Sequence, residues 1–335
     1  MDRRSRKGGA GPDSACTAGA DQNMSGVSTP PLRHAVERKA LLLSRIGAAV
    51  AVGTAVVIGV SPALAATGWT IVPTPPTGQN AAFTAVTTTS DSSAWAVGSE
   101  NAELSGVGAK ALIDHWNGAA WSQGATPATP GNTASLAAVS ASSTTDAWAV
   151  GRTQVNWEDF EPLALHWNGT AWSVSSSAAT ALAGSSNVNA FFPFNSIQVN
   201  SPTDVWAVGD QGVTDSSSST LIEHWGGKAW SIVPSPAPGS GSDLTGVTTS
   251  NTANDVWAVG YYDPTGTAQG QTLTLNWNGT KWVTAASPNA SSGFSVLDSV
   301  ATTPGAPIVQ AVSDSGACGD SGDSGATNPL ALQNG

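Results

Sequence analysis

Three histidines share one position in a repeated motif, and a set of three histidines is a known zinc ligand set. His115, His166 and His224 each precede Trp-Asn-Gly or its near copy Trp-Gly-Gly. Residues that share a slot in successive four-stranded repeats lie well over ~10 Å apart, because even adjacent strands are ~4.8 Å apart. The three side chains therefore cannot share an ion. We expect a structural role for them, in packing or in a hydrogen bond to the next repeat.

A second set of candidate residues consists of aromatic and carboxylate side chains that interrupt the repeats between their second and third predicted strands. Rings can stack on sugar faces, and carboxylates can accept hydrogen bonds from sugar hydroxyls. On loops of a rigid scaffold, such residues predict a ligand-binding face. The alternative is an ordinary solvated loop with isolated aromatics. The predicted ligand-binding residues are Trp157, Glu158, Asp159, Glu161, Asp210, Tyr261, Tyr262 and Asp263.

Catalytic chemistry finds weaker support in the sequence. The segment from Cys318 to Gly322 resembles the nucleophile segment of chymotrypsin-like proteases, but Asp323 replaces a glycine and no histidine outside the repeat slots could act as base. A glycoside hydrolase needs two carboxylates roughly 5–10 Å apart. The loop acids could supply them, whereas the predicted innermost strands carry almost no acids, Asp298 being the exception. The sequence favours a non-catalytic protein and leaves enzyme activity open.

No cofactor is predicted, with one alternative. Asp314, Asp320 and Asp323 in the C-terminal segment offer oxygen ligands of the kind that Ca²⁺ prefers.

The distribution of charge excludes one class of partner. Of the 335 residues, 12 are Lys or Arg and 23 are Asp or Glu, and after residue 65 only 4 basic residues stand against 19 acidic ones. A nucleic-acid backbone needs clustered basic residues, so nucleic acid is not an expected partner. Cys16 lies in the N-terminal region, which would be removed on export, so Cys318 would have no cysteine to pair with. We therefore expect core packing rather than a disulfide to hold the fold.

The N-terminal region has the pattern of a secretory signal peptide. Residues 46–60 are apolar and uncharged, Arg38, Lys39 and Arg45 precede them, and Ala63-Leu64-Ala65 follows. The run is short for a membrane span, although an uncleaved anchor is the alternative. We predict an extension and signal peptide over 1–65, with a start at Met1 or Met24. A secreted, monomeric domain over 66–335 would follow, without membrane contact after cleavage.

That domain consists of one unit repeated five times. Its motifs are Trp-Ala-Val-Gly, then His-Trp-Asn-Gly or a near copy, then a Trp three residues after that glycine. The first unit predicts strands over 83–89, 93–98, 111–117 and 119–123, with a type I′ turn at Asn117-Gly118. Four strands in a repeat of this length predict a β-propeller blade, with small residues on the innermost strands and tryptophans between blades.

The predicted fold is an all-β, five-bladed β-propeller of about 53-residue repeats. The fifth unit has Gln310 in place of the first-motif Trp, and the chain ends before its fourth strand. Gly68–Pro73 resembles the fourth strand of other units, so we expect the N-terminal strand to complete the last blade and remove an open edge. The blade units lie near 76–123, 124–174, 175–232, 233–284 and 285–335 plus 68–75.

These motifs resemble a tryptophan-rich repeat of secreted actinobacterial proteins. They are more loosely similar to Asp-box propellers and to the photosystem-assembly type with its Trp-Ala-Val-Gly strands, and at the level of fold to tachylectin-2-type lectins. The resemblance implies a propeller and export rather than a chemistry. In Asp-box hairpins an aspartate closes a turn, which is the role that the resemblance implies for Asp146, Asp204 and Asp255. The predicted function is a secreted binding module for a glycan or a cell-envelope polymer, with a protein–protein scaffold as the alternative.

Overall fold

A computed structural model of the chain describes residues 70–101, 108–155, 159–180, 190–213, 218–250, 254–264, 270–289, 294–302, 309–316 and 327–334. The predicted signal peptide lies outside these residues. Within them, no helix has the length and apolar character that a membrane crossing would require.

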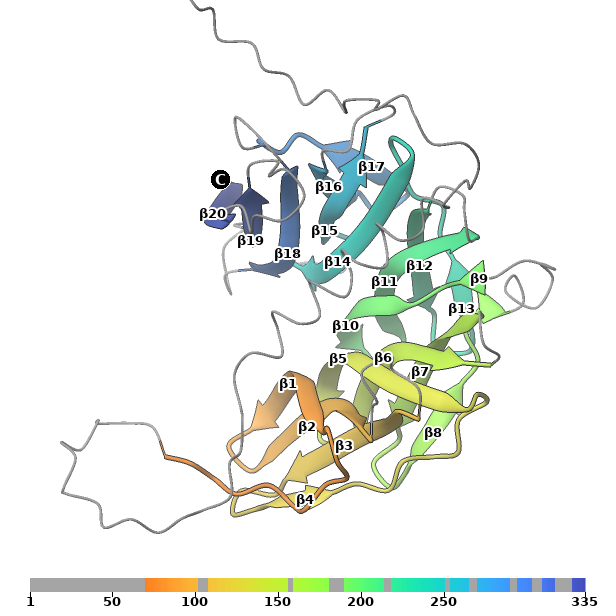
Figure 1. Ribbon diagram of the computed structural model, residues 1–335, viewed down its shortest axis with the longest axis vertical. Coiled ribbons are helices and arrows are strands. Elements are labelled where there is room, and N and C mark those ends of the chain that lie inside the picture. The colour runs from red at the N-terminus through yellow and green to blue at the C-terminus, as the bar shows by residue number, and fades with distance from the viewer. Residues whose placement is uncertain are drawn as a thin grey trace, which may run out of the picture.

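The fold is all-β, with the architecture of a β-propeller, and its strands are antiparallel within five successive units (Figure 1). Within the described residues, each of the first four units has four strands in chain order, and the fifth has three. The first unit contains β1 (Ala82–Ser90), β2 (Ser93–Glu100), β3 (Lys110–Trp116) and β4 (Trp121–Gln123). The second contains β5 (Thr133–Ser143), β6 (Asp146–Gln154), β7 (Phe160–Trp167) and β8 (Trp172–Ser175).

The remaining units follow the same order. The third contains β10 (Phe194–Ser201), β11 (Asp204–Val213), β12 (Ser219–Trp225) and β13 (Trp230–Ile232). The fourth contains β14 (Gly241–Thr249), β15 (Val256–Asp263), β16 (Gln271–Trp277) and β17 (Trp282–Ala285). The fifth contains β18 (Phe294–Thr302), β19 (Val309–Gly316) and β20 (Thr327–Asn334). The strands predicted for the first unit are confirmed to within a few residues.

Each innermost strand carries the same irregularity. The pairing register shifts between an apolar residue and the small residue two positions later, as between Leu136 and Ala138 or between Leu244 and Gly246. A β-bulge at this point increases the local twist of the strand. The next unit approaches closely at this small residue. A Cβ on Gly246 would lie 3.2 Å from the backbone nitrogen of Val300.

The glycine of Trp-Ala-Val-Gly is required by that bulge. A Cβ on Gly151 would lie 2.0 Å from the carbonyl oxygen of Ser135, and a Cβ on Gly260 would lie 1.9 Å from that of Asp243. Backbone atoms of the innermost strand occupy the space of a side chain, so this motif position selects glycine for close approach rather than for a special backbone angle.

We expect Gly151→Ala to lower the free energy of unfolding by about 1–3 kcal/mol, because the new methyl group must push two strands apart. Gly226→Ala is the matched control, since a Cβ at Gly226 would meet no atom within 4 Å. Urea denaturation of both variants measures the difference. Equal loss of stability in the two variants would contradict the close-approach argument.

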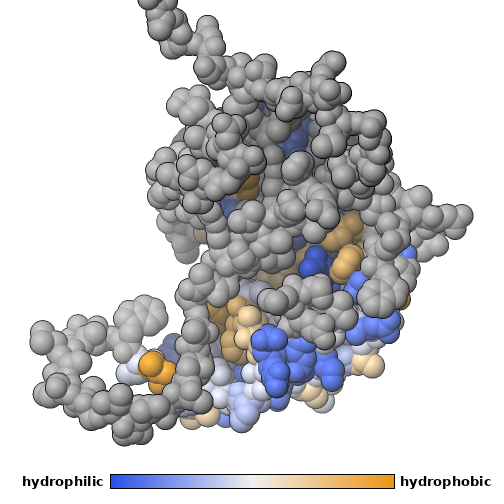
Figure 2. All heavy atoms as spheres, in the orientation of Figure 1, coloured by the Kyte–Doolittle hydropathy of each residue, from blue (hydrophilic) through white to orange (hydrophobic). Residues whose placement is uncertain are grey.

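Tryptophan rings form the contacts between units. Trp148 is fully buried and meets Trp225 and Trp230 of the next unit at centroid distances of 5.0 and 5.1 Å. Trp95 and Trp206 make the same pair of contacts at the first and third interfaces. Buried apolar side chains form clusters shared by neighbouring units. The described surface in view carries both hydrophilic and hydrophobic residues (Figure 2).

The Asn-Gly hairpin differs from the predicted two-residue type I′ turn. The last pair of the ladder is Trp116 with Trp121, which leaves a four-residue loop. Gly118 has a positive φ of 93°, but Asn117 does not belong to the positive-φ residues. Instead the Asn117 Oδ1 accepts hydrogen bonds from the backbone N–H groups of Ala119 and Ala120, both at 3.0 Å. This side-chain cap fixes the loop and explains why asparagine recurs there.

The second and third units are joined by a strand that the sequence analysis missed. β9 (Ala190–Phe191) pairs antiparallel with β11 and parallel with β7. It lies in the insertion between the two units and merges them into one nine-stranded sheet.

The predicted closing strand requires a correction. Residues 70–81 form no strand, and the described part of the last sheet contains three strands. Pro73, Pro75 and Pro76 have no N–H to donate to a ladder. The segment is held instead at the end of β2, where the Gly78 N–H donates to Glu100 Oε2 at 2.8 Å.

The first unit has an exposed apolar face on its first strand. Phe83 and Val86 are 39% and 64% exposed, whereas the corresponding Leu136 and Val139 of the second unit are 0% and 8% exposed. Figure 1 shows β1 and β18 at the two ends of the arc of sheets.

Candidate functional site

The loop side of the sheets, where β2-type strands end and β3-type strands begin, is held together by a repeated backbone hydrogen bond. The first residues of each unit donate to the loop of the unit before it. Ala134 N donates to Ala109 O at 2.8 Å, and Ser242 N donates to Ser218 O at 3.0 Å. The bonds from Phe192 to Phe160 and from Ser295 to Gly270 repeat this link. These bonds tie each unit to the next at the end of the sheets where the described loop-side residues lie.

Arg152 forms the centre of one group of loop-side residues. Its guanidinium carbon lies 4.9 Å from the centroid of the Phe160 ring and 5.9 Å from that of Phe191, and the two rings meet edge to face at 5.6 Å. Burial lowers the pKa of Arg152, and the negative charge of Asp210 opposes that shift. Asp210, a predicted binding residue, is itself buried and serves here as the counter-charge of Arg152.

The predicted acids of the second unit lie next to this group. Asp159 and Glu161 flank Phe160 at the start of β7 and are half-buried. Burial raises the pKa of Glu161, and the neighbouring charge of Asp159 raises it further. The carboxyl groups of Asp159 and Glu161 are thus close enough for their charges to interact, and Phe160 lies between them in the sequence. Trp157 and Glu158, also predicted, lie outside the described residues.

Tyr261, Tyr262 and Asp263 form a separate group at the end of β15 in the fourth unit. The Tyr262 hydroxyl donates to Gln271 Oε1 at 2.6 Å, and the Asp263 carbonyl accepts from Ser240 N at 2.8 Å. All three side chains are half-buried. The described contacts thus arrange the predicted residues in two groups, one around Arg152 and one at the end of β15.

The histidines stack on tryptophans and bond within their own sheet rather than to the next one. His166 Nε2 lies 2.8 Å from Asp146 Oδ1, and its ring stacks on Trp148 at 4.2 Å. His224 and Asp204 repeat this pair at 2.8 Å. The second oxygen of Asp146 accepts from the Ser142 hydroxyl at 2.5 Å, so the described hydrogen bonds of Asp146 go to side chains.

The first unit departs from this arrangement. Ser93 replaces the aspartate, and its hydroxyl lies 3.3 Å from His115 Nε2. Burial lowers the pKa of His115, which favours its neutral form.

Metal binding has no support in the described part of the chain, where no group of three or more His, Cys, Asp or Glu side chains could hold an ion. Asp320 and Asp323, and the side chain of Asp314, lie outside the described residues, so the Ca²⁺ alternative stays a prediction.

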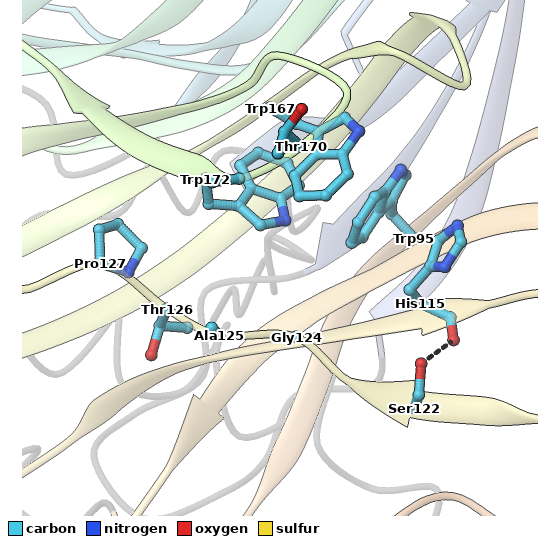
Figure 3. A pocket seen from close by; sticks show the side chains of 11 residues that line it. Trp95, His115, Ser122, Gly124, Ala125, Thr126, Pro127, Trp167, Thr170 and Trp172 are labelled. Atoms are coloured by element: carbon cyan, nitrogen blue, oxygen red, sulfur yellow. Dashed lines mark hydrogen bonds between the residues drawn. The ribbon is translucent and has the colours of Figure 1, made fainter.

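A cavity of about 370 Å³ lies between the first and second units, away from the predicted binding face (Figure 3). Rings of Trp95, His115, Trp167 and Trp172 line one part of it. The segment Gly124–Pro127 lines the other, with the Ser122 and Thr170 side chains at its edge. None of the lining residues is charged.

These tryptophans were expected to pack between units, and no cavity was predicted beside them. The position of Gly124 could have revealed it. Gly124 follows Trp121 by three residues, as Val233 follows Trp230, so aligning the units shows a missing side chain beside the tryptophan cluster.

Comparisons with known proteins find distant structural similarities but no family. No protein-family model matches the chain, and no curated protein matches it. Among solved structures, YCF48 bound to D1 peptide aligns with a TM-score of 0.42 and 15% identity, covering 80% of this chain and 72% of that one. A thermostable family-43 glycoside hydrolase gives 0.40 and 8%, covering 72% and 86%. A xylan β-1,4-xylosidase from Bacillus halodurans gives 0.39 and 10%, covering 78% and 54%. We infer no ligand or activity from these similarities.

Proposed function

We propose that this protein is a secreted, non-catalytic binding module that recognises a neutral glycan of the cell envelope through its loop side. The binding residues are the two groups described above together with Trp157 and Glu158. The observation that carries the proposal is the combination of half-buried rings and carboxylates, Phe160 with Asp159 and Glu161 and Tyr261 with Asp263, at the ends of rigid strands.

The charge of the chain supports a neutral polymer over an anionic one. Acidic residues greatly outnumber basic ones after residue 65, and on the loop side Arg152 is already matched by Asp210. An anionic polymer would be repelled, whereas sugar hydroxyls can donate hydrogen bonds to the carboxylates. Export by the N-terminal signal would place the protein beside such polymers.

Binding of the full chain to a glycan array and to purified envelope polysaccharides tests the proposal. We expect saturable binding to one class of neutral glycan. Tyr261→Ala should weaken it about tenfold or more, because an aromatic anchor is lost. Tyr261→Phe keeps the ring and should bind nearly as the original does.

Asp91→Asn provides a control on the opposite side of the sheets, where Asp91 lies exposed in the turn between β1 and β2. It should leave binding unchanged. If no glycan binds and a protein partner is captured at the same loops instead, the scaffold alternative replaces the glycan proposal. Equal binding by Tyr261→Ala and the original chain would remove Tyr261 from the site.

A further inference from the structure

The cavity between the first and second units arises where one interface departs from an otherwise repeated pattern. At three successive interfaces a tryptophan of one unit meets two tryptophans of the next. The centroid distances are 4.9 and 5.1 Å for Trp95, 5.0 and 5.1 Å for Trp148, and 5.1 and 5.4 Å for Trp206. The ring clusters are therefore nearly identical, and the cavity must come from what covers them.

The residue three positions after Trp121, Trp172 and Trp230 differs from unit to unit. It is Gly124 in the first unit, Ser175 in the second and Val233 in the third, and only Gly124 lacks a side chain. Gly124 N donates to Ile113 O at 2.8 Å, and Val233 N donates to Ile222 O at 2.9 Å, so the two residues occupy the same backbone position. The Val233 side chain packs against the cluster that contains Trp206 and Trp282. At the first interface Gly124 has no side chain to do this, and the space stays open (Figure 3).

A second difference between the units removes a carboxylate from the same interface. The corresponding histidines of the second and third units each face a carboxylate at 2.8 Å, whereas His115 faces the hydroxyl of Ser93. The cavity thus combines aromatic rings, an imidazole that faces no carboxylate, and the hydroxyl-bearing residues Ser122, Thr126 and Thr170. The Ser122 hydroxyl donates to the His115 carbonyl oxygen at 3.3 Å and keeps its capacity to accept. Both differences occur in the first unit: Gly124 lines the cavity, and Ser93 contacts the lining residue His115.

We propose that this cavity binds a pyranose ring of a neutral sugar. An apolar sugar face matches the tryptophan surface, sugar hydroxyls match the rim of hydroxyl groups, and the uncharged lining offers nothing to an ionic ligand. A volume of about 370 Å³ lies within the range of small-ligand pockets. This site is separate from the loop side and does not depend on the function proposed for it.

Titration of the full chain with methyl glucopyranoside, methyl galactopyranoside, methyl mannopyranoside and N-acetylglucosamine tests the site, by saturation-transfer NMR and tryptophan fluorescence. We expect saturable binding of at least one of these sugars in the millimolar range. Gly124→Val should weaken it about tenfold or more, because it installs the side chain that closes the third interface. A Cβ at Gly124 would lie 3.3 Å from Ile113 O, so a small adjustment accommodates it.

Gln123→Val is the matched control, because it adds valine one residue earlier at an exposed position. It should leave sugar binding within about twofold of the original value. If Gly124→Val does not fold, as judged by circular dichroism, Thr170→Val replaces it, since it removes an exposed rim hydroxyl at little structural cost.

Absence of saturable binding to all four sugars would overturn the proposal. Equal binding by the original chain and Gly124→Val would also overturn it, because the sugar would then lie elsewhere. Loss of binding in Tyr261→Ala with no change in Gly124→Val would place the sugar on the loop side. That outcome rejects the cavity and leaves the loop-side proposal intact.

Discussion

Replacing Trp148 with alanine is expected to lower the free energy of unfolding by about 3–5 kcal/mol. Trp148 is 0% exposed, and its ring contacts Trp225, Trp230 and His166. Truncation removes the largest buried side chain of the second interface and leaves a cavity that three rigid rings cannot collapse to fill. Urea denaturation followed by circular dichroism measures the loss, and a lower m-value would indicate that the units separate before they unfold.

Trp257→Ala is the matched control for this experiment. Trp257 occupies the same place in Trp-Ala-Val-Gly, but it is half-buried, and within the described residues no ring contact accompanies it. The fifth unit has Gln310 in place of the motif tryptophan, and its second motif lacks a tryptophan before Asn334. We therefore expect Trp257→Ala to cost about half as much. Equal losses would mean that burial within one sheet, rather than ring contact between units, determines the stability.

The repeat predicted the strands well because it combines two physical signals. Alternation of apolar and polar residues places one face of each strand inward, and the phase of the tryptophans fixes which face meets the next unit. Features that depend on backbone geometry were missed. The bulge before Ala138 and the four-residue loop after Trp116 arise from contacts between strands, and neither changes the apolar pattern.

Features that depend on competing partners were also missed. Residues 68–75 resemble a fourth strand, but the prolines and the bond from Gly78 to Glu100 favour a different position for the described part of this segment. β9 has two residues, too few for any periodic pattern.

The residues of the candidate site likewise include some that the sequence predicted and some that it did not. Breaks in the repeat identified the loop acids and tyrosines, since a residue that the repeat does not require is free to serve another purpose. Arg152 was overlooked because it directly follows the glycine of the repeated motif, a place taken by Ser99, Asp210 and Tyr261 in other units. The variability of that position was the available clue. The cavity needed a comparison of units at Gly124, where the informative residue is the one with no side chain.

Replacing Asp114 with leucine is expected to raise the free energy of unfolding by about 2–4 kcal/mol at neutral pH. Asp114 is 0% exposed, and neither of its carboxylate oxygens has a hydrogen-bond partner among the residues that the structure describes. Leu165 and Leu275 occupy the corresponding places in the second and fourth units and are fully buried. Leucine therefore fits the position, and it removes the cost of burying an unpaired carboxyl group.

Glu223 occupies the same place in the third unit and provides the opposite case. Its carboxylate accepts hydrogen bonds from the Ser177 hydroxyl at 2.6 Å and from the N–H groups of Ala178 and Ala179 at 3.0 and 2.7 Å. Glu223→Leu should lower the free energy of unfolding, because three donors lose their acceptor. Comparing the free energies of unfolding of the two variants distinguishes a buried carboxylate with hydrogen-bond partners, which stabilises the fold, from one without them, which destabilises it.

The stability gained by Asp114→Leu should depend on pH, because the pKa of Asp114 differs between the folded and unfolded states. Burial raises the pKa of Asp114 above its ordinary value of 3.8, and the charge of Glu100 raises it further. The folded state therefore holds this proton to a higher pH than the unfolded state does, and its contribution to stability is lost as pH rises through the folded pKa. The advantage of Asp114→Leu should be largest at neutral pH and should shrink toward about pH 4. An advantage that stays constant from pH 7 to about pH 4 would show that shape rather than charge sets the difference, and a loss of stability at pH 7 would show that Asp114 has a partner in solution.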